Sequence, residues 1–174
     1  MDSRAKIAGH AVHPMLIVFP LGLLATSLIF DFITLASGNR DWSAASFYMI
    51  AAGVVGGLLA AIFGLVDWLA IKKSTRAKAI GAWHGIGNVL VVGLFVISWA
   101  LRYSHRGRPG AAAIILSLVA VFLALATGWL GGELVERLGI GVDTGAHEDA
   151  PSSLSGAPIT QHATGLLREQ PART

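Results

Sequence analysis

The chain has no cysteine and little charge. Charged side chains make up only 13% of its 174 residues, about half the share found in a typical soluble domain. The lack of cysteine excludes disulfides, thiolate catalysis and cysteine-ligated zinc or iron–sulfur centres in this chain. Phosphate-binding loops, nucleophile elbows, His-Glu-x-x-His and c-type haem attachment motifs are also missing. We therefore assign no catalytic residue, and an enzymatic role is not favoured.

Long apolar runs dominate what is present. Hydrophobic residues supply 54% of the chain, and the mean hydropathy is +0.66. Four runs, at about 14–36, 44–71, 79–101 and 110–134, each reach the roughly 20 residues that a helix needs to span a bilayer. We predict an all-α integral membrane protein in which residues 1–142 form a four-transmembrane-helix bundle. Residues 143–174 are polar and predict a disordered tail, because they have little to bury.

Four spans place both ends of the chain on the same side of the membrane. The side of the termini carries seven basic residues, and the other side carries four. The first group is Arg4, Lys6, Lys72, Lys73, Arg76, Lys78 and Arg137, and the second is Arg40, Arg102, Arg106 and Arg108. The positive-inside rule therefore predicts cytoplasmic termini. Since the membrane explains the basic loops, we expect the lipid bilayer and no nucleic acid as a partner.

One face of the first run is polar. His10, His13, Ile17, Pro20, Leu24, Ser27 and Asp31 follow a three-then-four spacing, which places them on one side of a helix. Lipid excludes such a face, so it should point into the bundle. Pro20 should kink this helix. The other runs carry stripes of small or polar residues, which are typical of helix contacts in membranes. They are Gly53, Gly57, Ala60, Gly64 and Asp67 in the second run, Gly81, His84, Asn88, Val91, Phe95 and Ser98 in the third, and Ser117, Ala124, Gly128 and Gly131 in the fourth. Asp31, near Asp41, Arg102 and His105 at the opposite leaflet, is explained by a salt bridge or helix-end contact.

The polar residues at the terminal side predict a candidate site. They are His10, His13, Asp67, His84, Asn88 and Glu133. Imidazoles are good ligands for iron and other transition metals. We predict that His13 and His84 ligate a haem b iron or another transition metal, with Asp67, Asn88 and Glu133 around them as hydrogen-bonding neighbours and His10 a turn nearer water. Alternatively, His10 and His13 only cap the bundle at the interface, and His84 and Asp67 hydrogen-bond to each other. Each half begins with histidine and ends with a carboxylate, which suggests two parallel repeats.

Three classes of function follow from these features. The first is a cofactor protein that takes part in electron transfer, beside a redox membrane protein or in a homo-oligomer. The second is a structural or assembly subunit without a cofactor, which holds a partner through its glycine-rich faces. The third is a small transporter or proton conduit that uses Asp31, Asp67 and the histidines, although an apolar middle between two polar ends argues against a continuous path.

Several motifs resemble those of a known family. They are Gly9-His10-Ala11-Val12-His13-Pro14 with Phe19-Pro20-Leu21-Gly22, then Gly64-Leu65-Val66-Asp67, His84 with Asn88, Gly131-Gly132-Glu133-Leu134-Val135 and Gly139-Ile140-Gly141-Val142. Together they resemble a family of bacterial membrane proteins catalogued as domain of unknown function 2231. The resemblance implies four membrane helices in a bacterial inner membrane and no settled function. Relatives joined to cytochrome c or Rieske-type domains imply a redox neighbourhood. Leu138 stands where relatives often have a histidine, which removes one possible ligand.

Overall fold

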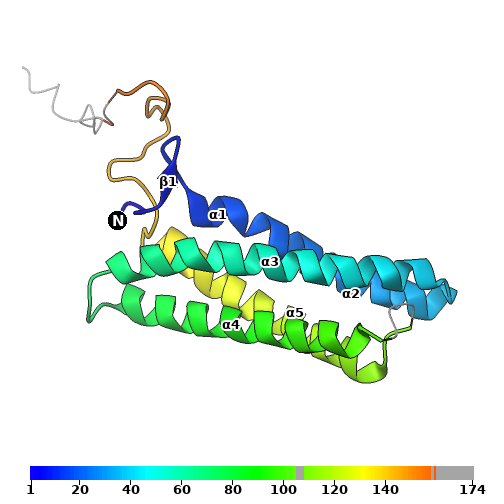
Figure 1. The fold of residues 1–174 in the computed structure, drawn as a ribbon. Helices are drawn as coiled ribbons and strands as arrows, with labels where there is room; N and C mark the ends of the chain where they lie inside the picture. Colours follow the sequence, from blue (N-terminus) through cyan, green and yellow to red (C-terminus); the bar gives the residue numbers. More distant parts are fainter. Residues whose placement is uncertain (105–107, 158, 160–174) are drawn as a thin grey trace, which may run out of the picture.

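The computed structural model describes residues 1–104, 108–157 and 159, and four long helical spans pack side by side in it (Figure 1). The first span consists of α1 (Val12–Leu16) and α2 (Val18–Ser37), and the second is α3 (Arg40–Ala70). The third is α4 (Arg76–Arg102), and the fourth is α5 (Ala111–Gly132) continued by the π-helical turn η1 (Glu133–Arg137). Each span is long and apolar enough to cross a membrane. The prediction of an all-α four-helix membrane bundle is confirmed.

Polar caps account for most of the difference between the predicted and observed helix ends. The Asn39 side chain accepts a hydrogen bond from the Asp41 amide (2.9 Å), so α3 begins at Arg40 rather than at residue 44. Thr75 Oγ1 likewise accepts from the Lys78 amide (3.2 Å), which starts α4 at Arg76 rather than at residue 79. A search for apolar runs passes over such first turns, because capping residues and their neighbours are polar.

The first span is broken where the proline predicts a kink. Pro20 has no amide hydrogen, so the carbonyl of Leu16 lacks its usual partner four residues later. The helix is interrupted at Ile17, between α1 and α2. The residues before the break and those after it can therefore face the rest of the bundle at different angles.

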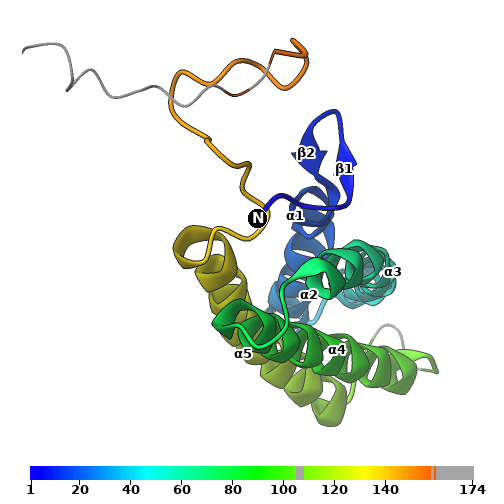
Figure 2. The same cartoon turned by 90° about the vertical axis from the view of Figure 1, so that its left-hand side faces the viewer.

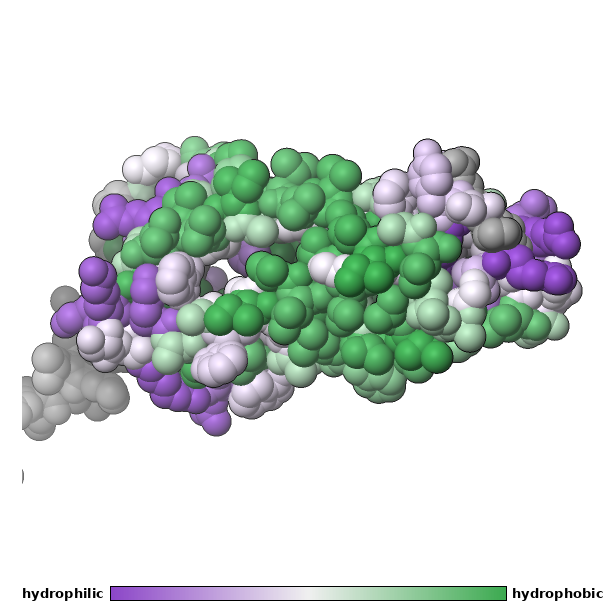
Figure 3. Space-filling model, turned by 60° about the horizontal axis from the view of Figure 1, so that its bottom comes forward, coloured by the Kyte–Doolittle hydropathy of each residue, from purple (hydrophilic) through white to green (hydrophobic). Residues whose placement is uncertain are grey.

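The core lies between the four spans and is small and apolar at its centre. Its buried members are Leu24, Ile50, Val91, Phe95 and Ala120. The outer faces are also apolar, and many large side chains on them are exposed. Figure 3 shows a broad hydrophobic band with hydrophilic residues at both ends. Lipid is the solvent that such a surface requires.

The residues before α1 form a short hairpin that the sequence analysis did not anticipate. Strand β1 (Lys6–Ile7) pairs antiparallel with β2 (His10–Ala11). Ala8 and Gly9 between them have φ values of +50° and +82°, the left-handed pair that a tight two-residue turn requires. The placement of His10 on the first helix was therefore wrong. The turn reverses the chain before α1 begins, so His10 leaves the helical period.

The segment after η1 has no helix or strand among its described residues up to 157. Residues 158 and 160–174 of the predicted disordered tail lie outside the described residues. The division into a membrane domain (1–142) and a tail stays a prediction.

Candidate functional site

His13 and His84 meet across the bundle. His13 comes from α1 in the first helical hairpin (α1, α2 and α3), and His84 comes from α4 in the second (α4, α5 and η1). Their ring centroids are 6.3 Å apart, and the ring planes cross at 87°. Both side chains are half-buried. The structure therefore brings together the two histidines that the sequence analysis selected as ligands.

Both imidazoles are held by the same kind of hydrogen bond. Nδ1 of His13 donates to the carbonyl oxygen of Ala60 on α3 (2.9 Å), and Nδ1 of His84 donates to that of Thr127 on α5 (2.8 Å). A carbonyl can only accept, so the proton of each neutral ring lies on Nδ1 and a lone pair remains on Nε2. A metal-bound histidine commonly makes this bond with its other ring nitrogen, because it fixes both tautomer and orientation.

Two glycines give the imidazoles their space. A Cβ at Gly64 would lie 2.9 Å from Nδ1 and Cε1 of His13, and one at Gly131 would lie 3.1 Å from Cε1 of His84. These glycines follow the two accepting residues, Ala60 and Thr127, by four positions each. Gly64 and Gly131 therefore lie one helical turn after the accepting residues. Because glycine has no side chain, each imidazole can lie close against the backbone of the facing helix.

The two helical hairpins repeat this arrangement. Residues of the first span correspond to residues of α4 that lie 71 positions later, and residues of α3 correspond to residues of α5 that lie 67 positions later. The pairs are His13 with His84, Ser27 with Ser98, Asp31 with Arg102, Ala60 with Thr127, and Gly64 with Gly131. Equivalent hydrogen bonds and glycine contacts in each half support the parallel repeat that the sequence suggested.

Asn88 supports His84. Its amide nitrogen donates to the backbone carbonyl of His84 (2.9 Å), and its oxygen accepts from the hydroxyl of Thr127 (3.1 Å). The same nitrogen lies 3.4 Å from Nδ1 and 3.2 Å from Nε2 of His84. The contact with Nε2 is at hydrogen-bonding distance, so a metal at Nε2 would replace this Asn88 bond. Asn88 is therefore the neighbour of the imidazole that the sequence predicts.

Asp67 faces the start of the chain instead of the imidazoles. Its carboxylate oxygens each accept from Oγ of Ser3 (2.8 Å), and Oδ1 also accepts from the backbone amides of Arg4 (2.7 Å) and Ala5 (3.4 Å). Residues 1–5, here called the N-terminal strap, are thereby held against the end of α3. We expected Asp67 to lie beside the histidines as a hydrogen-bonding neighbour, but these bonds direct its carboxylate to the strap instead.

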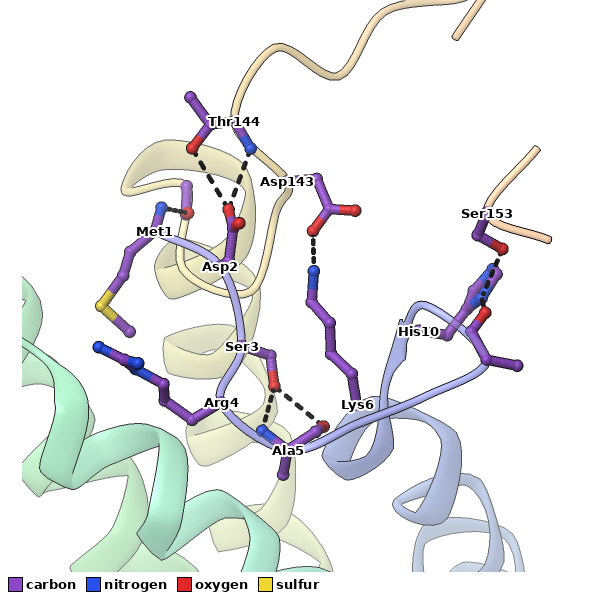
Figure 4. Close-up of polar contacts among 12 residues, drawn as sticks. Met1, Asp2, Ser3, Arg4, Ala5, Lys6, His10, Asp143, Thr144 and Ser153 are labelled. Carbon is purple, nitrogen blue, oxygen red and sulfur yellow. Dashed lines mark hydrogen bonds and ion pairs between the residues drawn. The ribbon is translucent and has the colours of Figure 1, made fainter. Parts of the chain in front are cut away.

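The strap and the residues after it also contact the segment that follows η1 (Figure 4). The amino group of Met1 donates to the carbonyl of Gly139 (2.7 Å), and Asp2 accepts from the amide of Thr144 (3.0 Å). Lys6, in β1, forms an ion pair with Asp143. The hydrogen bond from the Lys6 ammonium to the Asp143 carboxylate raises the pKa of Lys6 above its ordinary value.

The other two predicted neighbours lie at the edge of the site. Glu133 forms an ion pair with Arg76 at the start of α4 (2.5 Å). His10 is exposed on β2, where Nδ1 donates to the carbonyl of Ala8 (3.1 Å). Neither is hydrogen-bonded to His13 or His84 among the residues that the structure describes. Within the same residues, no group of three or more His, Asp or Glu side chains is arranged to hold a metal ion.

The far end of the bundle holds a buried ion pair. Arg102 donates from its two terminal nitrogens to the carboxylate oxygens of Asp31 at 2.6 and 2.8 Å. The two side chains are only 1% and 0% exposed. The expected salt bridge is confirmed. Arg102, which we counted as a loop residue, is the last residue of α4 and points inward, so the basic split between the two sides becomes seven to three.

Sequence reasoning missed two residues that act through their backbone carbonyls, and one serine near the start of the chain. Ala60 and Thr127 accept from the imidazoles through carbonyl groups, which every residue has, so their side chains carry no signal. Ser3 is buried and binds Asp67, although it lies in a short polar segment at the start of the chain. The positions of Ala60 and Thr127 could have been found only from the repeat, one turn before Gly64 and Gly131.

Comparison with known proteins gives a family and no relative of known function. A family model described as predicted membrane protein (DUF2231) matches residues 9–144, which is well over half of the chain. No curated protein and no solved structure matches the chain. The matched range includes all four spans, both imidazoles and the acceptors that hold them.

Proposed function

The chain belongs to the DUF2231 family of predicted membrane proteins, and we propose that it holds a b-type haem between His13 and His84 and passes electrons through it. The observation that carries the proposal is the spacing of the two rings. Metal–nitrogen bonds of about 2 Å put two imidazole nitrogens on opposite sides of one iron about 4 Å apart. The ring centroids then lie about 6.2 Å apart, since each centroid is about 1.1 Å behind its nitrogen in standard imidazole geometry. The observed separation is 6.3 Å.

The donor set favours a macrocycle over a bare ion. Two imidazoles leave four positions of an octahedral iron without a ligand, and the described residues offer no third histidine or carboxylate in the same group. A porphyrin brings four equatorial nitrogens of its own, so two axial histidines complete the coordination. Figure 3 shows the surface hollowed near the end at which the N-terminus lies.

The chain's own residues would orient the ligands. The Nδ1 hydrogen bonds to Ala60 and Thr127 keep the two ring planes crossed at 87° and leave Nε2 as the coordinating atom. With both axial positions taken by protein nitrogens, no position is left for oxygen or substrate. Such a centre suits electron transfer rather than oxygen chemistry.

Haem titration of the purified full-length chain tests the proposal. The parent protein should bind one haem with a sharp Soret band and split visible bands on reduction. His13→Ala or His84→Ala should each abolish the six-coordinate spectrum, and the double variant should add little, because loss of one ligand already destroys the centre. His10→Ala is the matched control, since His10 is exposed on β2 and should leave binding unchanged.

The axial geometry gives a second, independent readout. Crossed imidazole planes produce a highly anisotropic low-spin electron paramagnetic resonance signal, whereas parallel planes produce a rhombic one. Absence of haem binding by the parent, or binding by the His13→Ala and His84→Ala variants that equals that of the parent, would refute the proposed function. A bare transition metal that binds the parent but not the histidine variants would favour the other cofactor class.

A structural role is the second candidate, and the same hydrogen bonds support it. The bond from His13 joins α1 to α3, and the bond from His84 joins α4 to α5, so each imidazole already connects two spans. If this is their whole role, no cofactor binds, and each histidine substitution costs about 1 kcal/mol independently of the other.

A proton conduit is not favoured. The carboxylate of Asp31 is neutralised by Arg102, and the carboxylate of Asp67 is occupied by the strap. Along every span the apolar core separates these two ends.

The basic residues support an orientation with cytoplasmic termini in the bacterial inner membrane. The seven-to-three split that follows from the burial of Arg102 is wider than the split counted from sequence. A reporter fused after the last residue should therefore be active only in the cytoplasm. Activity confined to the periplasm would reverse the orientation and place the imidazole site in the outer leaflet. The partner would be a redox protein of the same membrane or a second copy.

A further inference from the structure

We propose that the N-terminal strap, residues 1–5, closes the water-facing end of the imidazole site and that Asp67 is the latch that holds it. The inference rests on the proposed function only in taking His13 and His84 as the site that the strap guards. It concerns access to these imidazoles and does not depend on which cofactor they bind.

One attachment of the strap is to the first helical hairpin, close to the site. Asp67 lies three residues after Gly64, which packs against the His13 ring, so the latch is about one turn from that imidazole towards the end of α3. Its carboxylate accepts from the Ser3 hydroxyl and from the amides of Arg4 and Ala5. Ser3 is only 7% exposed despite its place near the start of the chain. Three consecutive residues donating to one carboxylate make a specific anchor, since bonds to a charged acceptor are among the stronger ones.

The other attachment is to the segment that follows η1 and continues the second helical hairpin. Besides the bond from the Met1 amino group to Gly139, the amide of Gly141 donates to the carbonyl of Met1 (2.8 Å). Asp2 accepts from the amide and hydroxyl of Thr144. Figure 2, which looks onto this end of the bundle, shows the start of the chain between the end of α5 and α1. The strap therefore bridges the two helical hairpins at the end where His13 and His84 meet.

The way in which the strap is held makes it the part that opens. Its attachments are hydrogen bonds at the surface, and apart from Ser3 its side chains are exposed or half-buried. Chain ends held in this way open locally at far lower cost than helices packed in a core. Loss of the carboxylate should shift the strap towards the open state, because all three anchoring donors lose their acceptor together.

Chemical labelling of histidine measures access directly. The full-length protein, without added haem, is treated in detergent micelles with diethyl pyrocarbonate, which acylates the free imidazole nitrogen, and each site is quantified by mass spectrometry. His10 is exposed and serves as the internal reference. In the parent, His13 and His84 should react at least about ten times more slowly than His10. Asp67→Ala should raise their rates about ten- to hundredfold, the change expected when a hydrogen bond to a charged group is lost.

Two further variants separate the latch from general damage. Ser3→Ala removes one donor and keeps the carboxylate, so its rates should fall between those of the parent and Asp67→Ala. Asp149→Asn removes a charge from an exposed residue of the described tail and should change nothing. An unchanged His10 rate and an unchanged far-ultraviolet circular dichroism spectrum show that the bundle is intact. If Asp67→Ala unfolds it, the Ser3→Ala result decides.

Two outcomes would overturn the strap proposal. In one, His13 and His84 of the parent react as fast as His10. In the other, a folded Asp67→Ala or Ser3→Ala variant protects them as well as the parent does. Either result leaves the haem titration unaffected, and a failed haem titration leaves the labelling pattern unaffected, so the two proposals fail separately.

Discussion

Breaking the Asp31–Arg102 ion pair should be one of the most damaging changes that this protein can suffer. Both side chains are almost completely buried, and the guanidinium binds the carboxylate through two nitrogens. Arg102 also donates to the hydroxyls of Ser46, Ser98 and Ser117 and to the carbonyl of Ala113. Removal of one partner leaves a buried charge without compensation, which costs about 3–5 kcal/mol.

A double-mutant cycle gives the sharpest test. Asp31→Leu and Arg102→Met should each lower the free energy of unfolding by about 3–5 kcal/mol, because each leaves the other charge in an apolar setting. The double variant removes both charges and should lose no more than either single one, so the coupling energy should be about 3 kcal/mol or more. Unfolding in mixed micelles, by titration with sodium dodecyl sulfate and far-ultraviolet circular dichroism, measures all four free energies.

The same cycle bears on the candidate site. The ion pair joins α2 to α4 at one end of the bundle, and the imidazoles meet between α1 and α4 at the other. A slip by one helical turn moves a side chain by about 5.4 Å, which would destroy the spacing between His13 and His84. Arg102→Lys cannot make the bidentate contact and should give an intermediate loss. Single losses below about 1 kcal/mol that add in the double variant would refute the reasoning, since that is how a solvated surface pair behaves.

Glycine substitutions test the packing in the same unfolding assay. A Cβ at Gly87 would lie 2.3 Å from Cγ2 of Thr127, so Gly87→Ala should lower the free energy of unfolding by about 1–3 kcal/mol and weaken the bond from His84 to Thr127. Gly85→Ala is the control, because a Cβ there has nothing within 4 Å, and it should be neutral or slightly stabilising. Equal effects of the two would mean that this helix face is misassigned. Gly57→Leu should destabilise more than Leu58→Ala, because a Cβ at Gly57 would lie 3.3 Å from Cγ2 of Val92, whereas Leu58 is exposed on the outer face. The reverse order would contradict the inward placement of the stripe that contains Gly57.

The helical stripes show how far local pattern carries, and where it stops. Gly53 and Ala60 on α3, and Val91 and Ser98 on α4, are buried as their spacing predicts. On α5, Ser117 of the predicted stripe is buried, but Gly128 is exposed and its neighbour Thr127 is buried instead. Small residues occur around much of α5, so its sequence contains little contrast between faces. The choice there depends on the helix against which it packs.

The candidate site divides in the same way. His13 and His84 could be selected from sequence, because imidazoles are rare inside a membrane and both lie near one end of a span. Asp67 and Glu133 share that end, yet their carboxylates bind Ser3 and Arg76 instead. Depth in the membrane follows from position along a span, but the direction of a side chain at that depth depends on the neighbours that compete for it.

The sequence by itself determined the solvent, the number of spans and the level in the membrane at which each polar group lies. These depend on run length and composition, which are local properties of the chain. The tertiary structure alone decided that the imidazoles face each other at 6.3 Å, that the carbonyls of Ala60 and Thr127 hold them, and that Arg102 turns inward to Asp31. A hydrogen bond needs its partner within about 3 Å, and partners here are separated by 43 to 71 positions. Only the packing of the spans within each helical hairpin, and of the two hairpins against each other, brings them that close.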